Sequence, residues 1–427
     1  MTTQSPSRTM GLFLLLVAVV VTFSLFSNRL WGGKPEKLPE TRELVIREGM
    51  SVQEFGQANH LPNPVLKEVF RLEAVTDLEN RLSRYGTPDQ VKSLVIKKLA
   101  IAAEHSSKNW IKIPVKFALW FAFLIILFLV LKKRRVAPAL RKRLLFVSVL
   151  IFGVVMGSDP SPMGTVKDAI HLYGSARAIF PPRMIALTIF LLIVFLANKY
   201  ICAWGCQVGV LQDLIFHLNR TDQQNAIMGK QFKVPFVITN SVRFLFLGLF
   251  TSVAFAWGAD LIEPFDPFGI YRPAHLALGA TLFIGILLIA SLFVYRPWCH
   301  FFCPFGLVGW IVEKISRVRI SVDYRTCIAC QKCSAACPAT VMGAILMQDK
   351  KTTPDCFACY TCRDVCPTGS ISFSGRKRTM PPPGHFEKKR QGGGSGEGLE
   401  VRFSEVAADK SEAEAHRLRM DGKAGTG

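Results

Sequence analysis

The chain has 427 residues, of which 50% are hydrophobic, and its formal net charge is +21. A positive mean hydropathy beside 19% charged residues excludes a single large soluble core and indicates a membrane protein with soluble appendages. The basic residues crowd one loop at 132–143 between apolar segments, which is the positive-inside bias of a membrane protein, so we do not expect a nucleic-acid partner.

Six apolar stretches are long enough to cross a bilayer, which needs about 20 helical residues. The first has Arg8 ahead of its apolar run, but no small-residue cleavage site follows it, so it predicts an uncleaved anchor. The stretches lie near residues 10–31, 113–131, 143–158, 183–202, 239–258 and 277–296.

Residues 32–112, between the first two stretches, are long enough for a small helical domain. Ser51 and Glu54 fit a capping box, residues 65–70 have helical apolar spacing, and a third helix is expected over 88–104. This segment contains no cysteine. Its isolated His60 and His105 are expected to face solvent. We expect the domain to dock a partner or to cap the outer membrane face.

Orientation follows from the basic loop. If residues 132–142 are cytoplasmic, alternation of the spans puts residues 32–112 outside and everything after residue 297 inside. Cysteines that hold clusters also need a reducing compartment. We therefore expect a multi-pass, lipid-embedded protein of the cell inner membrane, with residues 32–112 periplasmic and the C-terminus cytoplasmic.

Two matched cysteine pairs follow the fourth and sixth stretches, with Cys202 and Cys206 in the first and Cys299 and Cys303 in the second. On a continuous helix, this i, i+4 spacing puts both sulfurs of a pair on one face. The surrounding spans look like two copies of one hairpin, so the pairs predict a four-thiolate site at the cytoplasmic membrane surface, holding a third iron–sulfur or other metal centre. A dithiol/disulfide relay and simple packing are the alternatives.

The other eight cysteines form two copies of C-x2-C-x2-C-x3-C-P, the ligand pattern of a bacterial two-cluster ferredoxin. In that pattern the fourth cysteine of each motif binds the cluster of the other motif. Zinc ribbons use two-ligand knuckles separated by a longer loop, which this spacing does not provide. We expect one [4Fe–4S] cluster on Cys327, Cys330, Cys333 and Cys366, and a second on Cys356, Cys359, Cys362 and Cys337.

The predicted fold class is mainly α: a polytopic helical bundle of about six spans with two repeated hairpins, followed by a small α+β two-cluster ferredoxin domain. The expected domains are an anchor (1–31), a periplasmic helical domain (32–112), a membrane helical domain (113–318), the ferredoxin domain (319–373) and a flexible polar tail (374–427).

A quinone site needs hydrogen-bond partners beside an apolar channel. Candidates on the inner side are Trp204, Asp213 and His217. Candidates on the outer rim are Asp168, His171, Tyr173, Glu263, Asp266 and Arg272. A haem between His171 and His275 is conceivable but has no supporting spacing.

The six spans, the two C-x3-C motifs and the double C-x2-C-x2-C-x3-C-P domain together resemble the NapH/MauN-type membrane ferredoxins. The membrane part of NosR and the CcoG-type proteins share this arrangement, which covers roughly residues 140–372. The resemblance implies electron transfer between the quinone pool, the cytoplasmic-side clusters and partner redox proteins, such as a cytochrome or an iron–sulfur subunit.

The chain also departs from this pattern. Gln207 stands where the family usually has proline, which predicts a looser turn, and residues 32–112 lack a flavin-attachment motif. We therefore expect an electron-transfer subunit of a quinol-linked oxidoreductase system rather than a stand-alone enzyme. The alternative is a membrane protein that assembles or senses a respiratory enzyme through thiol or metal handling.

Overall fold

In the computed structural model of the chain, the described residues are 5–31, 44–47, 49–61, 63–72, 74–107, 109–133, 136–221, 226–347, 354–375 and 378–386. From residue 387 onward, the predicted tail lies outside the described residues, as does the start of the predicted periplasmic domain at 32–43.

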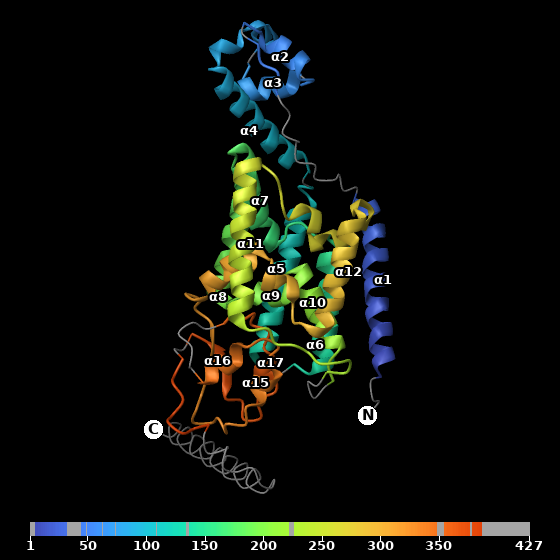
Figure 1. Ribbon diagram of the computed structural model, residues 1–427, viewed down its shortest axis with the longest axis vertical. Coiled ribbons are helices and arrows are strands. Elements are labelled where there is room, and N and C mark those ends of the chain that lie inside the picture. The colour runs from blue at the N-terminus through green and yellow to red at the C-terminus, as the bar shows by residue number, and fades with distance from the viewer. Residues whose placement is uncertain are drawn as a thin grey trace, which may run out of the picture.

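The molecule is elongated and has three tiers (Figure 1). A small helical outer domain lies at one end, a helical bundle lies in the middle, and a small lower domain with the only described sheet lies at the other end.

The outer domain forms because short amphipathic helices bury one common apolar face. Ser51 accepts a hydrogen bond from the Glu54 N–H, and the Glu54 carboxylate accepts one from the Ser51 N–H, which confirms the predicted capping box. His60 and His105 are both exposed, as expected. The elements are α2 (Val52–Ala58), α3 (Asn63–Phe70), η1 (Val75–Glu79), η2 (Leu82–Arg84) and α4 (Pro88–Ser107).

The bundle contains three helices that are long and apolar enough to cross a membrane, namely α1 (Pro6–Trp31), α5 (Lys112–Lys133) and α11 (Phe236–Trp257). Two apolar helices are shorter, α8 (Pro181–Ala197) and α12 (Leu278–Phe293). The predicted third span is α6 (Pro138–Ser148), which continues without a break into the π-helical η3 (Val149–Val155).

Shorter elements fill both ends of the bundle. The outer side carries α7 (Pro162–Ala176) and three short turns, η4 (Glu263–Phe265), η5 (Pro267–Tyr271) and η6 (Pro273–His275). The helices that follow α8 and α12 are α9 (Tyr200–Trp204), α10 (Gln207–Leu218), α13 (Pro297–Phe301) and α14 (Pro304–Glu313).

The lower domain pairs two short antiparallel strands, β1 (Arg319–Val322) and β2 (Ile371–Ser374), with Arg319 opposite Ser374. This register closes the domain by joining its two ends. Its inward-facing side chains form a core of their own together with the cysteines. The helices between the strands are α15 (Lys332–Ala336), α16 (Val341–Met347) and α17 (Thr361–Asp364).

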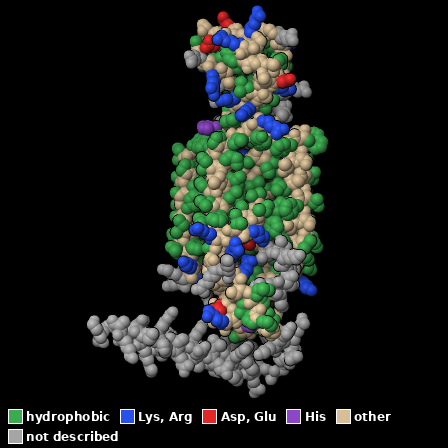
Figure 2. Space-filling view, turned by 90° about the vertical axis from the view of Figure 1, so that its left-hand side faces the viewer, with side chains coloured by type: hydrophobic (Ala, Val, Ile, Leu, Met, Phe, Trp, Pro, Cys, Tyr) green, Lys and Arg blue, Asp and Glu red, His purple; other side chains and the backbone are tan. Residues whose placement is uncertain are grey.

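The surface agrees with a membrane protein. Figure 2 shows a broad hydrophobic face over the bundle, with Lys and Arg side chains gathered at its lower edge and on the outer domain. Many large apolar side chains on the long helices are exposed, for example Leu119, Leu245 and Ile286. Such a contiguous apolar belt is stable only when lipid covers it.

Candidate functional site

Two cavities in the lower domain are each lined by four cysteines. The first, of about 350 Å³ including its mouth, is lined by Cys327, Cys330, Cys333 and Cys366. The second, of about 380 Å³ including its mouth, is lined by Cys337, Cys356, Cys359 and Cys362. These are the two crossed sets expected from the sequence. All twelve cysteines of the chain are free thiols.

The backbone around the two cavities follows the same path. Ala329 and Gln331 have positive φ in the first motif, and Ala358 and Tyr360 have positive φ at the equivalent positions of the second. Non-glycine residues adopt this conformation at a cost, and such turns direct successive N–H groups toward an anion. The repeated turns therefore fit a bound group of negative charge.

The donor arrangement does not fit a single ion. Among the residues that the structure describes, no three His, Cys, Asp or Glu side chains converge tightly enough to hold one metal ion. A cubane cluster is broader than one ion, and its thiolate ligands are spaced around a cavity. The cysteine-lined cavities have this form.

The membrane cysteines lie inside the bundle. Cys202, Cys206, Cys299 and Cys303 are all buried in its main core. The first three thiols lie close enough to that of Cys303 to interact with it electrostatically. The structure thus brings the two pairs together, and their location at the cytoplasmic membrane surface stays a prediction.

The two cysteines of each pair do not lie on one continuous helix, contrary to the sequence prediction. Cys202 lies in α9, whereas Cys206 has an extended backbone and caps α10; Cys299 lies in α13, and Cys303 caps α14. Each pair therefore lies at a helix break. Both cap thiols face the first turn of the following helix, and the Cys303 Sγ accepts a hydrogen bond from the Gly306 N–H at 3.3 Å. A helix N-terminus stabilises a thiolate there.

The two breaks have the same geometry. Cys206 has φ −70° and ψ 120°, and Cys303 has φ −67° and ψ 117°. Gln207 therefore does not loosen the turn, contrary to the sequence prediction. A Cβ added at Gly209 would lie 2.8 Å from the Cys202 carbonyl oxygen, and one at Gly306 would lie 2.8 Å from that of Cys299. Both positions need glycine because the chain passes so close.

Buried cations connect the two repeats. Arg296, from the second repeat, donates to the Cys202 carbonyl and, at 2.9 Å, to the Ala203 carbonyl of the first. Lys199, from the first repeat, donates to the Gly306 carbonyl of the second at 3.1 Å. These charges surround the four thiols and would offset the negative charge of a thiolate-bound cluster.

The loop of the lower domain that holds Cys356 contacts the buried cations of the bundle. Asp355 accepts hydrogen bonds from Lys199 at 2.6 Å and from Arg243 at 2.8 Å. The Phe357 ring lies 4.3 Å from the Lys199 ammonium and 5.3 Å from the Arg296 guanidinium. The loop therefore joins the second cysteine-lined cavity to the cations around the membrane cysteines.

Further polar contacts hold the lower domain against the bundle. Arg141 donates to the Asp364 carboxylate at 3.1 Å, and Glu313 accepts from the Cys356 N–H at 3.3 Å. Burial alone raises the pKa of Asp355, but Lys199 and Arg243 outweigh it and hold that pKa below its usual value. The Asp355 carboxylate is therefore charged where it meets the two cations.

Comparisons with known proteins agree with this site. Residues 319–380 match a family model described as a 4Fe–4S dicluster domain. Residues 179–225 and 276–322 match a model described as a 4Fe–4S binding domain, so each match contains one of the two membrane cysteine pairs.

Among curated proteins, the chain is 30% identical over 217 residues to YccM of Escherichia coli (strain K12), which is named as an electron transport protein. This match covers 48% of the chain and 59% of YccM. The chain is 23% identical over 211 residues to the methylamine utilization ferredoxin-type protein MauN of Methylobacillus flagellatus, covering 46% of the chain and 72% of MauN. The chain therefore resembles the NapH/MauN-type 4Fe–4S proteins over about half of its length.

Another relative agrees with this assignment. The regulatory protein NosR of Pseudomonas aeruginosa is 26% identical over 190 residues, which cover 39% of the chain and 24% of NosR. No solved structure matches the chain. These matches support an iron–sulfur electron-transport protein, and three helices in the described part of the chain are long and apolar enough to cross a membrane.

Sequence reasoning missed the residues that connect the lower domain to the bundle. Lys199, Arg243 and Arg296 are all fully buried, and each lies in or beside an apolar helix. Intramembrane charges are a signal of function, and this signal was visible in the sequence. Asp355 and Phe357 gave no such signal, because their role depends on contacts with residues distant in the chain.

The inner candidates for a quinone site make buried polar contacts in the structure. Asp213 accepts hydrogen bonds from Arg296 and from the Tyr295 hydroxyl, and it pairs with His217 at 2.8 Å. The Trp204 carbonyl accepts from Ser148 at 2.8 Å. All of these groups are buried in the packed core. These contacts stabilise the cysteine-bearing breaks, and a role of the three residues in quinone binding stays a prediction.

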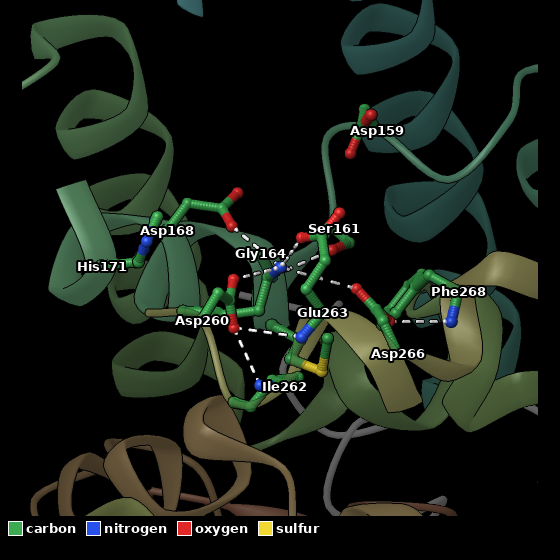
Figure 3. A network of polar contacts seen from close by, with 12 residues as sticks. Asp159, Ser161, Gly164, Asp168, His171, Asp260, Ile262, Glu263, Asp266 and Phe268 are labelled. Atoms are coloured by element: carbon green, nitrogen blue, oxygen red, sulfur yellow. Dashed lines mark hydrogen bonds and ion pairs between the residues drawn. The ribbon is translucent and has the colours of Figure 1, made fainter. Parts of the chain in front are cut away.

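On the outer side, four carboxylates surround Lys167. Figure 3 shows these four residues, Asp168, Asp260, Glu263 and Asp266, gathered in one network of polar contacts. The Lys167 ammonium lies 3.4 Å from Asp168, 2.9 Å from Asp260, 3.0 Å from Glu263 and 3.9 Å from Asp266. This network ties α7 to the turns before α12. Burial raises the pKa of Asp266 to about 7, although the positive charge of Lys167 opposes the shift.

The remaining outer candidates are less organised. His171 lies 3.0 Å from the Gly258 carbonyl oxygen, and Tyr173 is exposed. Arg272 pairs with Asp159. The side chain of His275 lies outside the described residues, so the haem considered from the sequence stays untested.

Proposed function

We propose that the chain relays electrons between the quinone pool and partner redox proteins, through two [4Fe–4S] clusters in the lower domain and a third centre inside the bundle. The observation that carries this proposal is the Asp355–Phe357 segment. This segment contains a proposed cluster ligand, Cys356. It also contacts Lys199 and Arg296, the two cations beside the membrane cysteines.

In this proposal, the two crossed sets of cysteines in the lower domain hold the two ferredoxin clusters. The cavities lined by these sets and the repeated positive-φ turns fit such groups. When bound, each cluster supplies a one-electron store. The chain's own residues hold the cluster sulfurs in place and exclude water from them.

Cys202, Cys206, Cys299 and Cys303 would hold the third centre. Four buried thiols, two helix N-termini and the cations Lys199 and Arg296 suit an anionic iron–sulfur cluster. The match of both pairs to a 4Fe–4S binding model supports this assignment. It also favours a cluster over a dithiol relay.

The Phe357 ring would shorten the gap between the second ferredoxin cluster and this centre. His300, which follows Cys299, stacks on Phe357 with ring centroids 5.0 Å apart and planes inclined by 11°. The two rings form a contiguous bridge of packed atoms from the Cys356 loop to the Cys299 loop. One-electron transfer needs such proximity and low solvent access rather than acid or base groups.

The proposed location is the inner membrane, with the lower domain in the cytoplasm and the outer domain in the periplasm. The Lys and Arg side chains at the lower edge of the apolar surface support this orientation (Figure 2). Partners on the cytoplasmic side would be small redox proteins or the iron–sulfur subunit of a larger enzyme.

The test is quinol-dependent reduction of the clusters. The full chain would be purified anaerobically, placed in liposomes, mixed with a short-chain quinol, and followed by EPR and optical bleaching. The proposal predicts reduction that reverses on addition of the oxidised quinone. Clusters that exchange no electrons with either form of the quinone, over a range of potentials, would contradict it and favour a role in assembly or sensing.

A further inference from the structure

An unassigned cavity lies at the outer end of the bundle, between α5, α7 and α8. The space inside it, counted together with the open solvent at its mouth, is about 540 Å³. Most of its wall is apolar and aromatic, with Trp110, Phe117, Phe180 and Ala186 among the lining residues.

Polar groups gather on one side of this cavity. Arg183 and Asp168 both line it and pair with each other at 3.0 Å, with side chains only 8% and 16% exposed. The Ser161 hydroxyl, also in the wall, accepts a hydrogen bond from the Gly164 N–H at 3.0 Å, so its own O–H can donate to a ligand. The cavity thus offers donors and a carboxylate acceptor beside an apolar chamber.

The position of the cavity suits a ligand that arrives from lipid. Trp110 and Pro182 are exposed beside it, at the outer ends of two apolar helices. On α8, the side chain of Ile185 is 61% exposed and faces away from the core. A lipophilic molecule with a polar head could enter sideways between α5 and α8 and leave its tail in the bilayer.

Aromatic rings connect the cavity to the membrane cysteines. Phe117 in its wall lies 5.9 Å from Phe190, which lies 6.4 Å from Phe305, measured between ring centroids. Phe305 is two residues after Cys303. A second contact joins α7 to the same pair, since the Trp298 indole donates to the Met163 sulfur at 3.1 Å and Cys299 follows directly.

We infer that this cavity binds the head group of a lipid-soluble quinone or quinol, at the outer rather than the inner side of the bundle. Quinone carbonyls accept hydrogen bonds, which Arg183 and Ser161 can donate, and quinol hydroxyls can donate to Asp168. The inference rests on the proposed function and adds the place of binding and the residues that contact the ligand.

The experiment measures equilibrium binding of radiolabelled decylubiquinone and of its reduced form, decylubiquinol, to the full chain in detergent. The variants are Ala186→Phe, which fills the cavity with an apolar ring, and Asp168→Asn, which keeps its shape. The matched control is Ile185→Phe, which adds the same ring to the lipid-facing side of α8. Iron content and cluster EPR are recorded for each variant to verify that it is folded.

We expect the affinity of Ala186→Phe to fall at least about tenfold while Ile185→Phe binds as the wild type does. Asp168→Asn should bind quinol more weakly, with a smaller change in its affinity for quinone. If Ala186→Phe loses its clusters, this difference between quinol and quinone binding tests the location of the site. Unchanged binding in both cavity variants, with quinol still reducing the wild-type clusters, would overturn the location and leave the proposed function standing. Absence of both binding and cluster reduction in the wild type would overturn both.

Discussion

The Asp355 carboxylate of the lower domain lies 2.6 Å from the Lys199 ammonium of the bundle, and both side chains are almost fully buried. Arg243 shares the same carboxylate at 2.8 Å. One carboxylate of the lower domain thus pairs with two buried cations of the bundle. This contact fixes where the cysteine loop of the lower domain meets the membrane cysteines.

Replacing Asp355 should therefore weaken the docking of the two parts. Asp355→Asn leaves two buried cations without their counter-charge, which costs roughly 3–5 kcal/mol for a broken buried pair. We expect a lower midpoint of thermal unfolding and faster proteolysis of the lower domain in detergent. Asp323→Asn is the control, because its partner Arg325 is 88% exposed and that pair contributes little. Equal destabilisation by the two substitutions would contradict the docking role.

The stacked rings of Phe357 and His300 predict an effect on the rate of electron transfer. Phe357→Leu removes the ring that packs against His300 and the cations, but it leaves Cys356 and its neighbours in the sequence unchanged. Iron content should match the wild type, whereas quinol-driven reduction of the lower-domain clusters should slow in stopped-flow measurements. Phe357→Tyr, which keeps the ring, should retain the wild-type rate. If Phe357→Leu also retained that rate, electrons would have to take another route.

The charge of Arg296 should set the potential of the third centre. Arg296 contacts the Cys202 loop and interacts with the thiol of Cys299, so its loss removes positive charge beside the proposed cluster. We expect Arg296→Gln to shift the potential of that centre by roughly 60 mV or more in the negative direction, which is about tenfold in equilibrium constant for one electron. Arg296→Lys should shift it less.

Redox titration followed by EPR checks this prediction. The control is Arg325→Gln, which removes an exposed charge in the lower domain. Arg296→Gln also removes the buried ion pair between Arg296 and Asp213, so Asp213→Asn is added to it to restore stability. A potential that returned to the wild-type value in this double variant would show that stability, rather than charge, had caused the shift.

The carboxylates around Lys167 predict that the free energy of unfolding depends on pH. Burial raises the pKa of Asp266 from 3.8 to about 7, so the folded protein binds this proton more tightly than the unfolded chain does. The free energy of unfolding therefore receives a contribution from Asp266 that is present below about pH 4 and is lost as the pH rises through about 7. Asp266→Asn should flatten the thermal stability profile between these values. Asp323→Asn is the control and should leave the profile unchanged; a profile unchanged in Asp266→Asn would contradict the prediction.

Much of the lower domain could be predicted, because the information is local. The spacing of the cysteines and the proline after each motif suggested which four would line each cavity, and the structure has these two groupings. The helices of the outer domain were also predictable, since Ser51 and Glu54 mark a helix start on their own.

The membrane site was less predictable, because the apolar runs hid its helix breaks. The run at 183–202 reads as one helix, yet α8 ends at Ala197 and Asn198 has a positive φ of 61°. Arg296 likewise has a positive φ of 47° before α13. Nothing local marks these turns, since they are held by hydrogen bonds to the other repeat and to the lower domain.

The most direct test of the central claim is the iron content of the anaerobically purified chain, with EPR during a redox titration, for the wild type and for Cys206→Ala/Cys303→Ala. The account predicts about twelve irons in the wild type and about eight in the double variant, with one EPR signal lost, because each cluster holds four. About eight irons in both proteins, with identical spectra, would contradict a third centre inside the bundle.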